Sequence, residues 1–259
     1  MRIILSGYND GATNMAIDEA ILEAYKQGKA PASLRIYGFR PACISIGRFQ
    51  KVDEVINIQS CEKDGIDFVR RISAGEAIFH DNEITYSLIG SKDDFNLPDN
   101  IKESYFILTN FIVRAYKNLG IDAGFFNIEK DESIKRNLCF ATQQGFDISV
   151  KGKKLGGNAQ KRMKNIVFQQ GSIPFYVEME DLACYINEDI KQIGHNITSI
   201  NEELKRLVDF NEMQSVLVDA FNKEFNVNGS IEELSTFEKE LAKELKEGKY
   251  SDPEWNDKL

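Results

Sequence analysis

The chain has few of the residues that build metal centres and disulfide scaffolds. Its two histidines, His80 and His195, are too far apart in the 259-residue sequence to suggest a histidine-rich metal site. The cysteines have neither the short spacings of metal ligands nor the density of a disulfide-stabilised domain. There are four of them: Cys43, Cys61, Cys139 and Cys184. We therefore expect free thiols in a reducing cytoplasm and no metal site.

The sequence also lacks long apolar runs, and we expect no N-terminal signal peptide. No segment approaches the roughly 20 apolar residues of a membrane-spanning helix. The first apolar run gives way to Ser6 and Gly7 too early for a signal peptide. The formal net charge of -9 argues against general nucleic-acid binding. We expect a cytoplasmic protein with neither a membrane nor a nucleic acid as partner.

What the sequence does contain is typical of a globular domain, with 42% hydrophobic and 28% charged residues. Strand-like runs come first, at residues 33–37, 42–46 and 84–89. Helical patterns follow, at residues 100–118, 180–191, 211–223 and 231–246. This order predicts an α+β fold. We expect a single domain over residues 1–259, with a core in about 1–200 and a helical C-terminal extension in about 201–259.

The densest group of reactive residues lies between residues 137 and 175. Cys139 is followed by an alternating apolar run, and Gly152 stands between two such runs, which is typical of a β-hairpin. The hairpin would bring Lys153 or Lys154 back towards groups placed earlier in the chain. A nearby cation lowers the pKa of a thiol, as a nucleophilic cysteine requires. The alternative is a buried, inert Cys139 beside a solvated lysine turn.

A second set of polar residues surrounds a loop of small residues, 73–76 (SAGE). Apolar runs flank this loop, so its backbone amides could reach a polar group of a ligand, with Arg70 or Arg71 nearby. No Gly-Lys-Ser/Thr follows, so the loop is not a phosphate-binding P-loop. His80 lies beside Asp81 in the sequence, and either a hydrogen-bonded structural histidine or an active-site donor fits the pattern.

The N-terminal region predicts an amphipathic helix at residues 15–24, with Asn14 as its N-cap. Asp18 and Glu19 could be catalytic carboxylates, but favourable positions in the helix dipole explain them more simply. Gly47 follows the run at 42–46 and suits a turn where the backbone approaches a ligand.

Four ordered segments together resemble one known superfamily. They are residues 14–19 (NMAIDE), 45–50 (SIGRFQ), 70–81 (RRISAGEAIFHD) and 152–160 (GKKLGGNAQ). These are similar to the lipoate–protein ligase and octanoyltransferase superfamily. The resemblance implies a mixed sheet with flanking helices, like the catalytic domain of biotin–protein ligases.

Cys139 makes the chain most similar to the cysteine-dependent, LipM-type octanoyltransferase branch, in which a Cys-Phe pair precedes the lysine strand by this spacing. The resemblance implies that octanoyl passes from acyl carrier protein to Cys139, and then to a lysine of a lipoyl-domain protein such as the glycine cleavage H protein. Lys154 matches the family's active-site lysine. No cofactor is needed for this reaction.

The resemblance also implies two further sets of residues. Those expected to bind the acyl substrate are Arg70, Arg71, Ser73, Ala74, Gly75, Glu76, His80, Gly157, Asn158 and Ala159. The basic stretch from residue 151 to 164 is either a solvated loop or a docking site for the acidic carrier protein. Its docking residues would be Lys151, Lys153, Lys161, Arg162 and Lys164.

The chain departs from the family pattern at three places. The loop carries Ala74 where relatives have glycine, which would be penalised if that position needed a positive φ. Glu76 places an acid where some relatives have a base. Gln170-Gly171 stands where many relatives have His-Gly. Three other activities stay open: an ATP- and Mg-dependent lipoate or octanoate ligase, an amidotransferase between lipoyl domains, and a non-enzymatic lipoate-binding relative.

Overall fold

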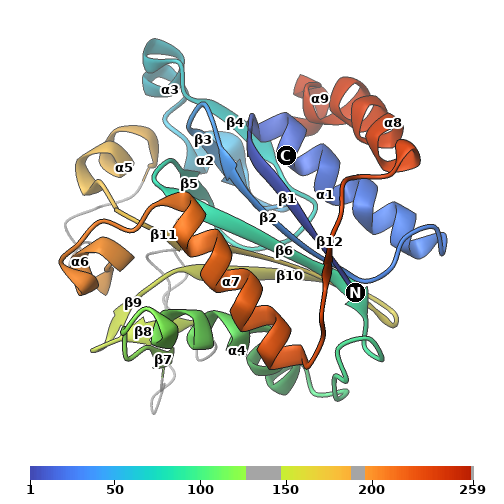
Figure 1. The fold of residues 1–259 in the computed structure, drawn as a ribbon. Helices are drawn as coiled ribbons and strands as arrows, with labels where there is room; N and C mark the ends of the chain where they lie inside the picture. The colour runs from blue at the N-terminus through green and yellow to red at the C-terminus, as the bar shows by residue number, and fades with distance from the viewer. Residues whose placement is uncertain (127–146, 188–195, 258–259) are drawn as a thin grey trace.

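The computed structural model describes residues 1–126, 147–187 and 196–257, and a six-stranded mixed sheet runs through its centre (Figure 1). The strands lie in the order β10 (Gly157–Met163), β11 (Ile166–Pro174), β6 (Glu83–Ser91), β2 (Ser33–Phe39), β1 (Arg2–Asn9) and β12 (Ser230–Ile231). β1 pairs in parallel with β2 and β12, and the other pairs are antiparallel. The predicted α+β class and the strands at 33–37 and 84–89 are confirmed.

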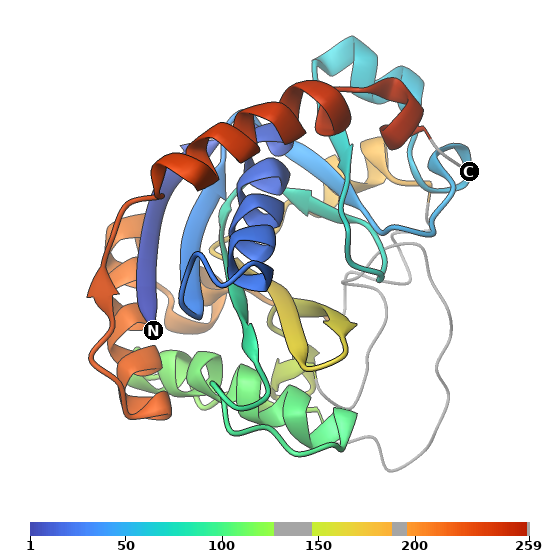
Figure 2. The same cartoon turned by 90° about the vertical axis from the view of Figure 1, so that its right-hand side faces the viewer.

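Helices cover both faces of this sheet (Figure 2). α1 (Gly11–Lys26) and α8 (Thr236–Leu245) pack together on one face, and α4 (Ile101–Asn118) and α7 (Phe210–Phe225) on the other. Successive strand residues point to opposite faces, so Ile3 joins the core beneath α4 and α7 while Ile4 joins the core beneath α1. Because both faces are covered, β2 is buried along its whole length.

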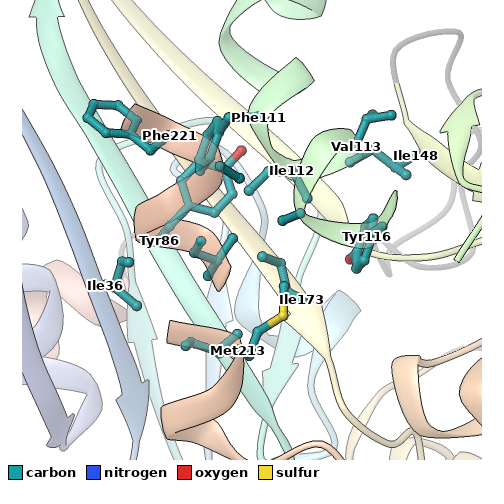
Figure 3. Packing of buried hydrophobic residues seen from close by; sticks show 14 of the residues in the cluster. Ile36, Tyr86, Phe111, Ile112, Val113, Tyr116, Ile148, Ile173, Met213 and Phe221 are labelled. Atoms are coloured by element: carbon teal, nitrogen blue, oxygen red, sulfur yellow. The ribbon is translucent and has the colours of Figure 1, made fainter. Parts of the chain in front are cut away.

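The larger core is built on aromatic contacts between β6, α4 and α7 (Figure 3). The ring of Phe111 meets Tyr86 edge-on at 5.1 Å between centroids and Phe221 at 5.8 Å. The hydroxyls of two buried tyrosines in this core bond to β10 and to the residue shortly before it. Tyr86 donates to Asn158 Oδ1 at 2.6 Å, and Tyr116 donates to the carbonyl of Leu155 at 3.0 Å. The core therefore fixes the start of β10.

Two small sheets and four short helices lie between the strands and long helices named so far. One sheet has the order β4 (Asp67–Arg70), β3 (Cys43–Ile46) and β5 (Ile78–His80); the other has the order β7 (Gly124–Phe125), β8 (Ile148–Val150) and β9 (Lys153–Lys154). The short helices are α2 (Val52–Val55), α3 (Ile58–Asp64), α5 (Met179–Tyr185) and α6 (Ile200–Leu204). None of the described helices is both long and apolar enough to cross a membrane.

The predicted start of the first helix is wrong. The side chain of Asp10, not Asn14, caps α1, accepting from the backbone N–H of Thr13 at 2.7 Å. Asn14 lies inside the helix, where its amide donates to the carbonyl of Gly38 at 2.9 Å. Since the helix begins earlier, Asp18 lies two turns into it, beyond the reach of the N-terminal dipole.

The C-terminal end also differs from the prediction. Ile231 was expected in a helix, but it lies in β12 and pairs with Ile3. The helix starts at Thr236 because Ser235 and Glu238 form a reciprocal capping box. A π-helical turn (Lys246–Tyr250) and α9 (Pro253–Asn256) follow. The segment after residue 200 thus supplies a strand as well as helices.

Candidate active site

A cavity of about 190 Å³ lies where the loop after β4, the start of β10 and the lysine hairpin meet. It brings together Lys154 and most of the residues predicted to bind the acyl substrate. Its wall consists of Arg71, Ala74, Gly75, Glu76, Tyr105, Asp147, Lys154, Asn158, Ala159 and Gln160. Four predicted residues do not line it: Arg70, Ser73, His80 and Gly157.

Lys154 projects into this cavity from the predicted hairpin, which is confirmed as β8 and β9. Lys151 and Gly152 form its turn, both at positive φ. Lys154 is buried, with its Nζ 2.8 Å from Asp147 Oδ2. The sequence reasoning missed Asp147, although the register offered a signal. Ser149 pairs with Lys154, so the side chain two residues before Ser149 lies on the same face of the hairpin.

Arg71 shapes the loop of small residues. Its guanidinium donates to the carbonyls of Ser45, Ala74 and Glu76 at 3.0, 3.2 and 2.8 Å. The residue with a positive φ in this loop is Gly75, at +107°, not Ala74. The alanine that departs from the family pattern therefore adds its methyl group without backbone strain.

A buried polar network holds the loop from the other side. Ser73 donates to Gln170 Oε1 at 3.1 Å, and Gln170 Nε2 donates to Asp18 Oδ2 at 2.7 Å. The carboxylate of Asp18 also accepts from Arg35 at 2.7 Å and from Tyr37 at 2.8 Å. Burial and the charge of Asp18 hold the pKa of Tyr37 well above its usual range, so its hydroxyl stays a donor. Asp18 is thus a support of the site and not a dipole-driven surface acid.

A narrow inner pocket of about 20 Å³ adjoins the cavity, with Arg71 and Ala159 common to both walls. His80 lines it, but both ring nitrogens are occupied. Nε2 lies 2.7 Å from Ser45 Oγ and Nδ1 lies 2.5 Å from Glu83 Oε1. The carboxylate partner of His80 is therefore Glu83 and not the adjacent Asp81. The remaining wall consists of Met15, Tyr37, Ser45, Ile78, Thr85, Gln170, Gly171 and Ser172.

The basic stretch divides between two places. On the hairpin, Lys151 lies 3.3 Å from Glu203 and Lys153 lies 3.1 Å from Glu202, so acids of α6 face both lysines. The other basic residues lie along β10 and its turn: Lys161, Arg162 and Lys164. Their role in docking stays a prediction.

One predicted site residue lies outside the described part of the chain. Cys139 lies in the range 127–146, which the structure does not describe. Within the described ranges, no group of three or more histidine, cysteine, aspartate or glutamate side chains is placed to hold a metal ion.

Comparisons with known proteins agree with this arrangement. Residues 10–222 match the family model of the lipoyl protein ligase A/B catalytic domain. Octanoyltransferase LipM of Geobacillus kaustophilus is 35% identical, covering 98% of this chain and 97% of that protein. Octanoyltransferase LipM of Clostridioides difficile is 36% identical, covering 99% of this chain and 98% of that protein. A crystal structure of lipoate-protein ligase A bound with ATP has a TM-score of 0.83 at 24% identity, covering 99% and 98%, which shows a shared fold.

Proposed function

The chain belongs to the lipoyl protein ligase A/B catalytic domain family, and on that premise we propose that it is an octanoyltransferase of protein lipoylation. The similarity to octanoyltransferases named LipM extends over nearly the whole of both chains, so it includes the loop, the lysine hairpin and the C-terminal helices. The proposal assigns Cys139 as the nucleophile and octanoylated acyl carrier protein as the donor.

The reaction has two acyl-transfer steps. In the first, the Cys139 thiolate attacks the thioester carbonyl of the donor, a new carbon–sulfur bond forms, and the carrier leaves as a thiolate that takes up a proton. In the second, the neutral amine of a lysine on a lipoyl-domain protein, such as the glycine cleavage H protein, attacks the enzyme thioester. The amide forms, one proton is lost from nitrogen, and the Cys139 thiolate is released. Neither step needs ATP or a cofactor.

The observation that carries the proposal is Lys154, buried in the cavity wall with Asp147 2.8 Å away. A fixed ammonium group in a cavity shielded from water stabilises negative charge that develops on a carbonyl oxygen in the transition state. It also favours the thiolate form of a nearby cysteine. The ion pair with Asp147 holds the ammonium group in one orientation before the substrate arrives.

The inner pocket has apolar side chains that suit an acyl chain, but its volume is too small to hold one. Its wall includes the apolar side chains of Met15, Ile78 and Ala159. A volume of about 20 Å³ has room for little more than one water molecule. An octanoyl chain must therefore displace a side chain, and Met15 is the flexible one in this wall. Cavity residues Arg71, Gly75 and Asn158 would then surround the carbonyl end.

Intact-mass measurement of the protein mixed with octanoyl-acyl carrier protein, without ATP, tests the proposal. Wild type should gain one octanoyl group and Cys139→Ala none. Transfer to H protein that appears only when ATP and free octanoate are supplied would instead establish a ligase. Octanoylated H protein as the preferred donor would establish an amidotransferase. The cytoplasmic location and the use of the basic stretch for carrier docking are further parts of the proposal.

A further inference from the structure

Arg70 was predicted to bind substrate, but the contacts of its guanidinium are all to backbone carbonyls of this chain. Nη1 donates to the carbonyls of Gly47, Arg48 and Gln50 at 3.1, 3.2 and 2.7 Å. Nε and Nη2 donate to the carbonyl of Asn256 at 3.2 and 2.9 Å, and Nε also to that of Trp255 at 3.1 Å. One side chain therefore joins the turn 47–50 to the C-terminal tail, by which we mean residues 249–256. Trp255 in this tail is 185 residues away from Arg70 in sequence.

Side chains of the tail also hydrogen-bond to the backbone of Arg70. The indole Nε1 of Trp255 donates to the carbonyl of Arg70 at 2.8 Å, and Asn256 Oδ1 accepts from its N–H at 2.9 Å. The tail is also fastened to α1, because the hydroxyl of Tyr250 and the ammonium group of Lys249 both bond to Glu19, at 2.6 Å each. These contacts clamp the end of β4 between the tail and the turn 47–50.

The clamped turn lies directly against the loop that lines the cavity. The N–H of Arg48 donates to the carbonyl of Ser73 at 2.9 Å. Gly47 approaches the loop so closely that a Cβ there would lie 1.8 Å from the carbonyl oxygen of Gly75. Arg71, which organises the loop, is the next residue along the chain from Arg70. Arg70 is therefore linked to both sides of the loop, through the turn 47–50 and through Arg71.

We propose that Arg70, Trp255 and Asn256 form a clasp that positions the cavity loop for acyl transfer, so that Arg70 acts through the loop and does not touch the substrate. The proposal rests on the octanoyltransferase function argued above. It gives the C-terminal tail a role, because the last described residues of the tail contact the end of β4, next to the cavity loop. It also predicts that lysine cannot replace this arginine, because a lysine ammonium carries the same charge but cannot span five carbonyl groups.

The test compares Arg70→Lys, Trp255→Phe and Asn256→Ala with wild type in the loading of Cys139 from octanoyl-acyl carrier protein. Loosening the loop misplaces the groups that stabilise the transition state, so each variant should lower the maximal loading rate by about tenfold. The half-saturating donor concentration should change by less than about twofold, because the substrate loses no contact. Arg114→Lys, an exposed arginine on α4 paired with Glu224, is the matched control and should load like wild type.

A double-mutant cycle separates the clasp from direct substrate binding. If Arg70 acts through the tail, Arg70→Lys and Asn256→Ala together should be no slower than the slower single variant. If the double variant lowered the loading rate by the product of the two single effects, the clasp would be overturned. A half-saturating donor concentration that rises in Arg70→Lys alone would also overturn it and make Arg70 a substrate ligand.

The single tryptophan of the chain, Trp255, gives a readout that does not depend on activity. Arg70→Lys should increase quenching of its fluorescence by acrylamide while the melting temperature stays close to that of Arg114→Lys. Unchanged quenching would contradict the clasp. If wild type loads no octanoyl, the proposed function fails; the same variants are then compared in octanoylation of H protein with ATP and free octanoate, where equal rates would reject the clasp.

Discussion

Replacing Lys154 with methionine separates the stability of the buried ion pair from its part in the chemistry. The Nζ lies 2.8 Å from Asp147 Oδ2, and both side chains are at most 4% exposed. At this distance the attraction is about 6 kcal/mol for an effective dielectric constant of about 20, and desolvation of the two ions offsets most of it. Lys154→Met removes the attraction and keeps the desolvation of Asp147, so we expect a loss of about 3–5 kcal/mol in the free energy of unfolding.

The double variant Lys154→Met with Asp147→Asn removes both charges. It should recover most of the lost stability, because replacing a whole buried pair is far less costly than breaking it. Loading of Cys139 should stay at least about 100-fold slower than wild type in both variants, since neither can stabilise the developing oxyanion. Denaturant unfolding and intact-mass loading kinetics on the same preparations measure the two effects. If the double variant regained activity together with stability, Lys154 would be a structural residue only.

Two further predictions follow from buried ionisable groups. Burial opposes the ionisation of Glu238, but hydrogen bonds from Arg2 and Ser235 hold its pKa below the usual value. This carboxylate therefore stabilises the fold above about pH 4, and the contribution is lost as the pH falls through the lowered pKa. Glu238→Gln should be less stable at neutral pH and lose less stability on acidification; equal pH profiles would contradict this. Burial raises the pKa of the Cys43 thiol well above its usual value and that of Cys61 to about 11. Since the thiolate is the reactive form, iodoacetamide should leave both cysteines unmodified in the native protein near neutral pH. Rapid labelling of either cysteine would refute the reasoning.

Local patterns predicted much of the fold. α4 shows why: its apolar residues recur at helical spacing, Asn100 caps its start, and the structure begins the helix at Ile101. The hairpin at Gly152 was predictable for the same reason, because alternation and turn residues act over a few positions. The first helix was misplaced at its start because two polar residues, Asp10 and Asn14, could each serve as a cap and only tertiary contacts decide between them.

The supports of the site were beyond local patterns. Gln170 reaches Asp18 across 152 residues of sequence, and Arg70 reaches the tail across 185. A buried carboxylate and a surface carboxylate look alike in a sequence, so Asp18 was attributed to the helix dipole. Arg70 and Arg71 are neighbours in the sequence, but strand alternation sends one side chain to the tail and the other to the cavity loop.

A single-turnover chase tests the central claim most directly. The protein is loaded with octanoyl-acyl carrier protein, separated from the donor and from all nucleotides, and then mixed with H protein while both masses are followed. The account predicts that the octanoyl mass leaves the enzyme as it appears on one lysine of H protein, at equal rates, and that Cys139→Ala carries nothing to transfer. Octanoylation of H protein by Cys139→Ala at the wild-type rate, or an enzyme adduct that H protein does not remove, would contradict a covalent thioester on Cys139 as the intermediate.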